Sequence, residues 1–123
     1  MEYKEKSLQK AEPASPKVNQ TLTYPCTIGS IGSVHIYEAW LSVADDGGWT
    51  SYVSMHNASS LWGCRVKFNW RLMEGNVIRC EYSTPWYGMG VKDNRQAYEH
   101  GVSECFKSHF SQISSYVCEV RFE

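Results

Sequence analysis

Cysteine and histidine carry the most distinctive chemistry in this chain. A pair of thiols can form a disulfide, and thiolates with an imidazole can bind a metal ion such as zinc. Cys105 and His109 are four residues apart, so on a helix they would lie on one face at a spacing that can chelate one ion. The five cysteines are Cys26, Cys64, Cys80, Cys105 and Cys118.

A complete metal site is not indicated by motif. No Cys-x-x-Cys or His-Glu-x-x-His pattern accompanies Cys105 and His109. Further ligands would have to come from strands, with Cys80 or Cys118 as donors. We therefore assign no metal site and expect no cofactor. We interpret His109 as a side chain that hydrogen-bonds a backbone carbonyl at the edge of the core.

The spacing of the cysteines excludes one disulfide. Residues 62–82 alternate as a hairpin whose even positions are apolar. A connection at residues 73–75 places Cys80 opposite Phe68, on the order of 13 Å from Cys64 along the sheet. A disulfide requires Cα atoms within about 7 Å.

Other disulfides remain open beside the interpretation that the cysteines are free thiols in the core. The open pairings join Cys26 to Cys118 or Cys64, and Cys80 to Cys105 or Cys118. The candidate disulfide cysteines are therefore Cys26, Cys80, Cys105 and Cys118.

Acid–base chemistry has few candidates. Glu38 shares its strand face with Ile36 and Trp40, so its carboxylate must be paired or have a raised pKa. His35 faces the opposite side of the strand by parity, so the two form no dyad. We assign no catalytic residue, and a small hydrolase or nuclease using His35 or His56 with Glu38 is an alternative. The cations that would pair with Glu38 across strands are Arg65, Lys67 and Arg79.

The connection at residues 85–90 has the composition of a binding loop. Trp86, Tyr87 and Met89 lie between a proline and two glycines. Aromatic residues in loops often dominate binding energy, so these three are the leading candidate binding residues. Trp49, which follows the turn at residues 45–48, is a second candidate.

Composition narrows the classes of function. The 123 residues are 42% hydrophobic and 14% aromatic, with a net charge of −1. Scattered basic residues disfavour nucleic acid as a partner, and no apolar run is long enough for a membrane span. The cysteines slightly favour a secreted or periplasmic location over the cytoplasm.

The elements that would position these residues are mostly strands. Alternation predicts strands near residues 21–26, 33–43, 49–56, 62–72, 76–82 and 116–122. Apolar residues at three-to-four spacing predict one helix at about residues 94–113, with Tyr98, Val102 and Phe106 among its core residues. Both faces of residues 33–43 are fairly apolar, which predicts a strand covered on both sides. The expected fold class is α+β: an antiparallel sheet of five to six strands, with this helix packed on a face and followed by a last strand.

Residues 1–19 are polar and contain two prolines, so we expect a flexible arm before a single α+β domain at residues 20–123. The leading hypothesis is a non-enzymatic binding module, such as an inhibitor, immunity-type or accessory assembly protein, that recognises a protein partner through the aromatic loop. A carbohydrate-binding domain, in which Trp and Tyr rings stack on pyranose faces, is a further alternative.

Overall fold

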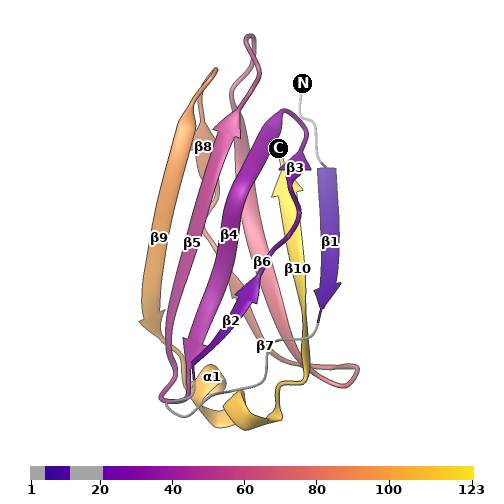
Figure 1. The fold of residues 1–123 in the computed structure, drawn as a ribbon, viewed down its shortest axis with the longest axis vertical. Coiled ribbons are helices and arrows are strands. Elements are labelled where there is room, and N and C mark those ends of the chain that lie inside the picture. The colour runs from indigo at the N-terminus through magenta and orange to yellow at the C-terminus, as the bar shows by residue number, and fades with distance from the viewer. Residues whose placement is uncertain (1–4, 12–20) are drawn as a thin grey trace.

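Two antiparallel β-sheets pack face to face in the computed structural model of the protein, which describes residues 5–11 and 21–123 (Figure 1). Sheet A has the strand order β1 (Glu5–Ala11), β10 (Ser115–Phe122), β6 (Cys64–Glu74) and β7 (Val77–Ser83), with β8 (Tyr87–Met89) also paired to β6. Sheet B has the order β2 (Thr21–Pro25), β4 (Val34–Ala44), β5 (Gly48–Asn57) and β9 (Asn94–Val102), with β3 (Ser30–Ile31) paired to β4. The short helix α1 (Glu104–His109) and the 3-10 turn η1 (Phe110–Gln112) connect β9 to β10.

The core lies between the sheets and is filled by alternate side chains of both. The even positions Val66, Phe68, Trp70 and Leu72 of β6 are buried, as the alternation predicts. Polar groups on the inner faces bond across the core. The Trp70 indole donates to the Tyr24 carbonyl at 2.9 Å, which ties sheet A to sheet B.

The ends of the predicted hairpin differ from the expectation. Trp62 and Ile78 are 73% and 51% exposed, so neither belongs to the core. The connection is the two-residue turn 75–76, where Gly75 has φ +59°. A register shift then places Cys80 opposite Leu72 rather than Phe68. Cys64 and Cys80 are still not bonded to each other.

The predicted helix at residues 94–113 is wrong over its first half. Asn94–Val102 form β9, an edge strand whose outward side chains meet solvent, so Tyr98 and Val102 are exposed. Gly101 lies so close to Trp49 that a Cβ would be 2.8 Å from the indole ring. The helix starts only after Ser103, whose hydroxyl accepts a hydrogen bond from the Phe106 amide. Hence only the second half of the apolar stripe is helical.

The prediction that residues 33–43 are covered on both faces is also wrong. The register of β4 against β5 shifts between Ile36 and Glu38, which is a β-bulge at Tyr37. Before the bulge the even residues point inward, and after it the odd residues Ala39, Leu41 and Val43 are buried. Both faces look apolar in the sequence because the inward-facing residues are even-numbered before the bulge and odd-numbered after it.

Part of the expected N-terminal arm is also paired. Glu5–Ala11 form β1, antiparallel to β10, whereas residues 1–4 and 12–20 lie outside the described residues. Within residues 5–11 and 21–123, two five-stranded antiparallel sheets and one short helix therefore replace the expected single sheet of five to six strands with a helix on its face. Among the described residues, no helix is long and apolar enough to cross a membrane.

Candidate functional site

Three aromatic side chains form a continuous strip on the outer face of sheet B. Trp40, Tyr52 and Tyr98 are directly opposite one another on β4, β5 and β9. Their ring centroids are 5.8 Å apart for Trp40 and Tyr52, and 4.4 Å apart for Tyr52 and Tyr98. The residues directly before and after each of them on its own strand point inward, so the three rings point to solvent. Tyr98 is 67% exposed. We call these three residues the aromatic strip.

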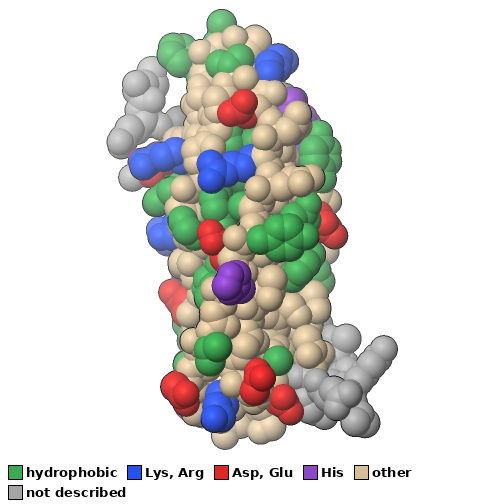
Figure 2. Space-filling view, turned by 90° about the vertical axis from the view of Figure 1, so that its left-hand side faces the viewer, with side chains coloured by type: hydrophobic (Ala, Val, Ile, Leu, Met, Phe, Trp, Pro, Cys, Tyr) green, Lys and Arg blue, Asp and Glu red, His purple; other side chains and the backbone are tan. Residues whose placement is uncertain are grey.

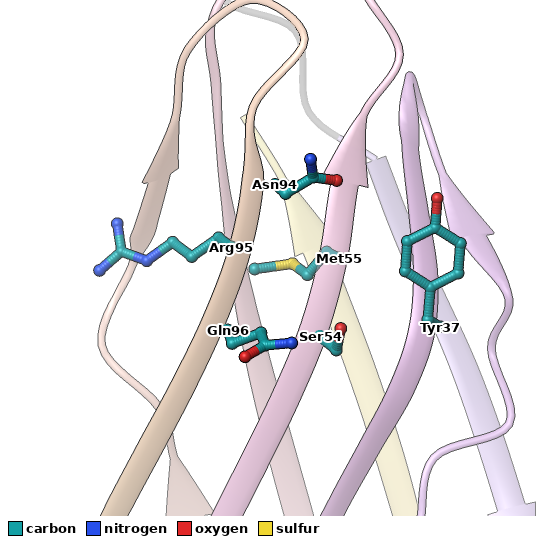
Figure 3. A pocket seen from close by; sticks show the side chains of 6 residues that line it. All are labelled: Tyr37, Ser54, Met55, Asn94, Arg95 and Gln96. Carbon is teal, nitrogen blue, oxygen red and sulfur yellow. The ribbon is translucent and has the colours of Figure 1, made fainter.

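A hollow of about 460 Å³ adjoins the aromatic strip on the same face (Figure 3). Ser54 and Gln96 lie two residues along β5 and β9 from the strip, so they point to the same side. A volume of this size is in the range that small ligands occupy. The hollow is lined by Tyr37, Ser54, Met55, Asn94, Arg95 and Gln96.

The bulge in β4 supplies one wall of the hollow. Tyr37 is the extra residue at the register shift, so both Tyr37 and Glu38 are exposed. The Tyr37 side chain is 67% exposed and stands across the hollow from Asn94 and Gln96 (Figure 3). Bulges commonly re-aim a side chain in this way next to binding sites.

The polar groups of the hollow are hydroxyls and amides. Ser54, Asn94 and Gln96 offer both donors and acceptors. His56 Nδ1 lies 2.9 Å from Asn94 Oδ1 and holds that amide in place. The Arg95 guanidinium points away from the others (Figure 3), because it donates to the Gly88 carbonyl at 2.8 Å and lies over the Tyr87 ring.

The outer face of sheet B is nearly free of charge. The outward positions of β2, β4, β5 and β9 include Glu38 but no lysine or arginine. In Figure 2, hydrophobic side chains gather midway along the molecule on the side that sheet B forms. The surface therefore combines aromatic rings with neutral hydrogen-bonding groups.

The expected aromatic loop contributes little to the surface. Tyr87 and Met89 form β8 and are 2% and 3% exposed, so they belong to the core. Trp86 is half-buried on the outer side of sheet A, with Arg65 and Lys67 within 5.3 Å and 5.7 Å of its ring. The loop thus presents one aromatic ring rather than three hydrophobic side chains.

Trp49, the second candidate binding residue, lies apart from the aromatic strip. It lies on the inward side of β5 and is half-buried against the core. Its ring centroid is 4.4 Å from that of Tyr82 on sheet A. Trp49 therefore packs between the sheets and does not join the aromatic strip.

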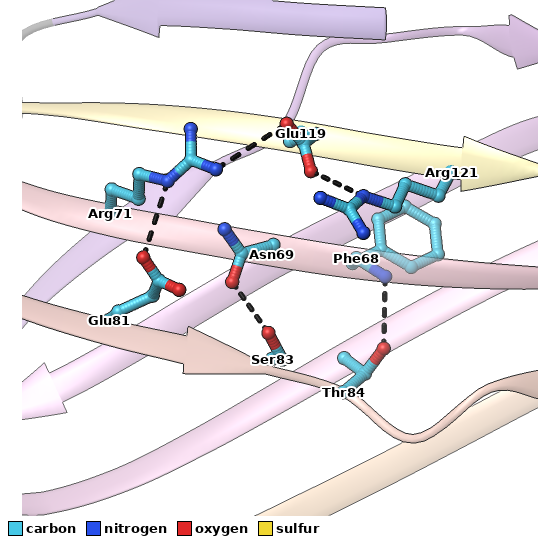
Figure 4. Close-up of polar contacts among 8 residues, drawn as sticks. All are labelled: Phe68, Asn69, Arg71, Glu81, Ser83, Thr84, Glu119 and Arg121. Carbon is cyan, nitrogen blue, oxygen red and sulfur yellow. Dashed lines mark hydrogen bonds and ion pairs between the residues drawn. The ribbon is translucent and has the colours of Figure 1, made fainter. Parts of the chain in front are cut away.

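The outer face of sheet A carries a network of compensated charges (Figure 4). Glu119 is 1% exposed and accepts from Arg121 Nε at 2.7 Å, and Arg71 Nη2 lies 3.5 Å from it. Arg71 also pairs with Glu81 at 3.3 Å. A buried carboxylate must be paired, so these ion pairs are accounted for by the need to stabilise the buried Glu119 in the folded protein.

The acid–base candidates are arranged differently from the sequence prediction. The bulge puts Glu38 on the same outer face as His35, and Glu38 is exposed rather than set among apolar side chains. Two of the cations expected to pair with Glu38 have other partners: Arg65 pairs with Glu123 and Arg79 with Glu74. The sequence argument that Glu38 must be paired because it lies among apolar side chains therefore does not apply.

One of the open disulfide pairings is present. Cys80 and Cys105 are bonded, with Cα atoms 5.9 Å apart. Cys26 and Cys118 are buried free thiols. A hydrogen bond between these two thiols lowers the pKa of Cys26. The pKa of Cys118 is raised, mainly by burial and to a smaller extent by the same hydrogen bond.

Sequence reasoning missed the aromatic strip and Tyr37. A usable signal was present in β5, where Tyr52 alternates with buried residues and shares its face with Thr50 and Ser54. An aromatic ring on an otherwise polar strand face has no core to fill, which is typical of a binding surface. The contribution of Tyr98 was hidden by the incorrect helix.

No protein-family model matches this chain, and no curated protein matches it.

Proposed function

We propose that this protein is a non-enzymatic binding module whose ligand is a neutral oligosaccharide. The observation that carries the proposal is the aromatic strip running into a hollow lined by amides and hydroxyls, where Arg95 turns its guanidinium away to the Gly88 carbonyl. This combination supports carbohydrate better than it supports a charged ligand.

The chemistry of a sugar ring matches both parts of the site. Its C–H groups form an apolar face that packs on aromatic rings, and its hydroxyl groups need partners that both donate and accept. Tyr and Trp lose little conformational entropy when they are held in place. The three rings of the strip contact one another and are therefore already ordered for stacking.

The aromatic strip also suggests the direction in which a bound oligosaccharide would cross the sheet. Trp40, Tyr52 and Tyr98 cross three adjacent strands, and Pro25 on β2 extends the row beyond Trp40. Adjacent strands are about 4.8 Å apart, so the row offers a contact line of roughly 10–15 Å. A line of this length fits several linked sugar units better than a single one.

A protein partner is the second candidate function, supported by a different surface. Leu61 and Trp62 are 76% and 73% exposed in the loop between β5 and β6. Their amides donate to Ser59 Oγ at 3.2 Å and 3.0 Å, so the loop holds both side chains outward. An ordered, exposed Trp is typical of a protein-binding hot spot.

The test is a binding screen over neutral and charged oligosaccharides, followed by calorimetric titration of variants. Tyr52→Ala and Tyr98→Ala should each weaken binding of the neutral ligands by about tenfold or more, equivalent to about 1.4 kcal/mol. Trp86→Ala, which removes a half-buried ring from the opposite sheet, is the matched control and should leave the affinity within about twofold.

Two results would count against the proposal. One is a screen in which no neutral oligosaccharide binds. The other is binding that Trp62→Ala abolishes while Tyr52→Ala and Tyr98→Ala leave it intact, which would favour the loop at Leu61 and Trp62 instead.

A further inference from the structure

Three metal-ligating side chains come together where α1 meets β7. The ligand atoms of Cys80, Cys105 and His109 all lie within 4.8 Å of one another. In the structure the two cysteines form a disulfide beside the imidazole. We propose that the same three side chains form a zinc site when this disulfide is reduced, so that the site holds either a disulfide or Zn²⁺.

The imidazole is already placed for zinc. In a tetrahedral site with Zn–S near 2.3 Å and Zn–N near 2.0–2.1 Å, a sulfur and a nitrogen ligand are about 3.6 Å apart. His109 Nδ1 lies 3.8 Å from Cys80 Sγ and 3.7 Å from Cys105 Sγ. Once reduction lets the two sulfurs separate, an ion can enter between them if the ring turns Nδ1 away from the Cys105 carbonyl.

The exchange between the two states is balanced. A reductant supplies two electrons that break the S–S bond and leave two thiols: a dithiol also gives the two protons and becomes a disulfide, whereas with a phosphine both protons come from water and the phosphine becomes its oxide. Zn²⁺ then binds two thiolates and one neutral imidazole, and two protons are released to solvent. Reoxidation by a disulfide-forming oxidant removes two electrons, expels the ion and restores the S–S bond.

His109 must change its hydrogen bond to bind the ion. Its Nδ1 now lies 3.1 Å from the Cys105 carbonyl, which places a proton on Nδ1. In the zinc state the proton resides on Nε2, and the Nδ1 lone pair points at the metal. The carbonyl contact therefore belongs to the disulfide state.

The surroundings allow the exchange to occur in the folded protein. Cys80 is buried in β7, whereas Cys105 and His109 are half-buried on α1 and can be reached by a reductant and by the ion. Sites with three protein ligands usually keep a water molecule as the fourth ligand. Thiolate and imidazole ligands favour zinc over calcium or magnesium.

The test compares the reduced and oxidised full-length protein. After reduction with a phosphine and its removal under argon, zinc content is measured by native mass spectrometry, and Co²⁺ is added as a spectroscopic substitute. We expect one zinc per reduced chain, none in the oxidised chain, and absorption bands of tetrahedral cobalt–thiolate coordination. Zinc should also raise the melting temperature of the reduced chain only.

Variants assign the ligands. Cys80→Ser and Cys105→Ser should abolish metal binding, and His109→Ala should weaken it at least about tenfold. Cys64→Ser, at a half-buried free thiol elsewhere, is the matched control and should bind as the wild type does. If Cys80→Ser fails to fold, the comparison of oxidised with reduced wild type still decides the matter.

Three outcomes would overturn the inference. They are the absence of metal from the folded reduced chain, equal metal content in oxidised and reduced chains, and binding that survives His109→Ala and Cys80→Ser. None of these outcomes bears on carbohydrate binding, since the zinc site lies on α1 and β7 rather than on the outer face of sheet B.

Discussion

Tyr24 and Tyr116 share a ring contact in the core but use their hydroxyl groups differently. Their ring centroids are 5.2 Å apart in an edge-to-face arrangement. Tyr116 Oη donates to the Pro25 carbonyl at 2.6 Å. Tyr24 Oη is buried and has no hydrogen-bond partner among the described residues. At the residue scale, two tyrosines in contact therefore contribute differently to stability.

This contrast predicts opposite effects for one chemical change. Tyr116→Phe removes a buried hydrogen bond and leaves the Pro25 carbonyl unsatisfied, so it should lower the free energy of unfolding by about 1–2 kcal/mol. Tyr24→Phe removes a hydroxyl without a described partner and should be neutral or stabilising. Urea unfolding followed by fluorescence measures both, and a loss of more than about 1 kcal/mol in Tyr24→Phe would contradict the account.

Asn57 is a second residue whose role depends on its surroundings. Residues 57–59 match a glycosylation sequon, yet the Asn57 side chain is fully buried. Its amide donates to the Trp62 and Gly90 carbonyls at 3.0 Å and 2.9 Å, and its Oδ1 accepts from Ser33 Oγ at 2.7 Å. The side chain thus holds together the loops at one end of the two sheets.

Asn57→Ala should therefore destabilise the fold by about 2–3 kcal/mol, because several buried partners lose their hydrogen bonds at once. Asn76→Ala, in the exposed turn between β6 and β7, is the control and should change stability by less than about 0.5 kcal/mol. Equal melting temperatures for the two variants would contradict this role of Asn57.

At the element scale, β4 connects the fold to the candidate site. Its bulge changes which parity faces inward and places Tyr37 at the wall of the hollow. Without Tyr37, residues 34–36 and 38–43 would continue a regular alternation, with Glu38 outward and Ala39 inward. The extra residue is thus not needed for the core.

Deletion of Tyr37 separates stability from binding. The shortened β4 keeps Ile36 opposite Met55 and Glu38 opposite Ser54, so the free energy of unfolding should change by no more than about 1–2 kcal/mol. Binding of the neutral oligosaccharide should weaken by about tenfold or more, because one wall of the hollow is lost. A variant that folds and binds with unchanged affinity would contradict this role of the bulge.

The elements also show what the sequence could and could not predict. Period-two alternation located β2, β6 and β10, since each buries one face regularly against the core. It failed at β9, where an edge strand exposes apolar Tyr98 and Val102 and their spacing of four imitates a helix. The bulge in β4 and the burial of Tyr87 and Met89 depend on pairing with distant strands, which local pattern does not encode.

At the scale of the whole molecule, the two outer faces differ in character. Sheet A presents paired charges around Glu119, whereas sheet B presents rings, hydroxyls and amides. The core between them also sets the response to pH. Burial raises the pKa of Tyr24 and of Tyr116 to about 12.

These pKa values predict loss of stability in alkali. Unfolded tyrosine has a pKa near 10, so between about pH 10 and pH 12 the unfolded chain has lost protons that the folded chain keeps. The free energy of unfolding should fall as pH rises through this window. Urea titrations at several pH values measure the slope, which should be smaller in Tyr116→Phe; an equal slope in that variant would contradict the assignment.

The central claim is that the outer face of sheet B binds a neutral oligosaccharide. The most direct test is to map the backbone amide chemical shifts while the protein is titrated with the neutral oligosaccharide that bound most tightly in the screen. We predict that the largest shifts cluster on β4, β5 and β9 around Trp40, Tyr52 and Tyr98, and extend to Ser54 and Gln96 beside the hollow. Shifts confined to sheet A or to the loop at Leu61 and Trp62, with the aromatic strip unaffected, would contradict it.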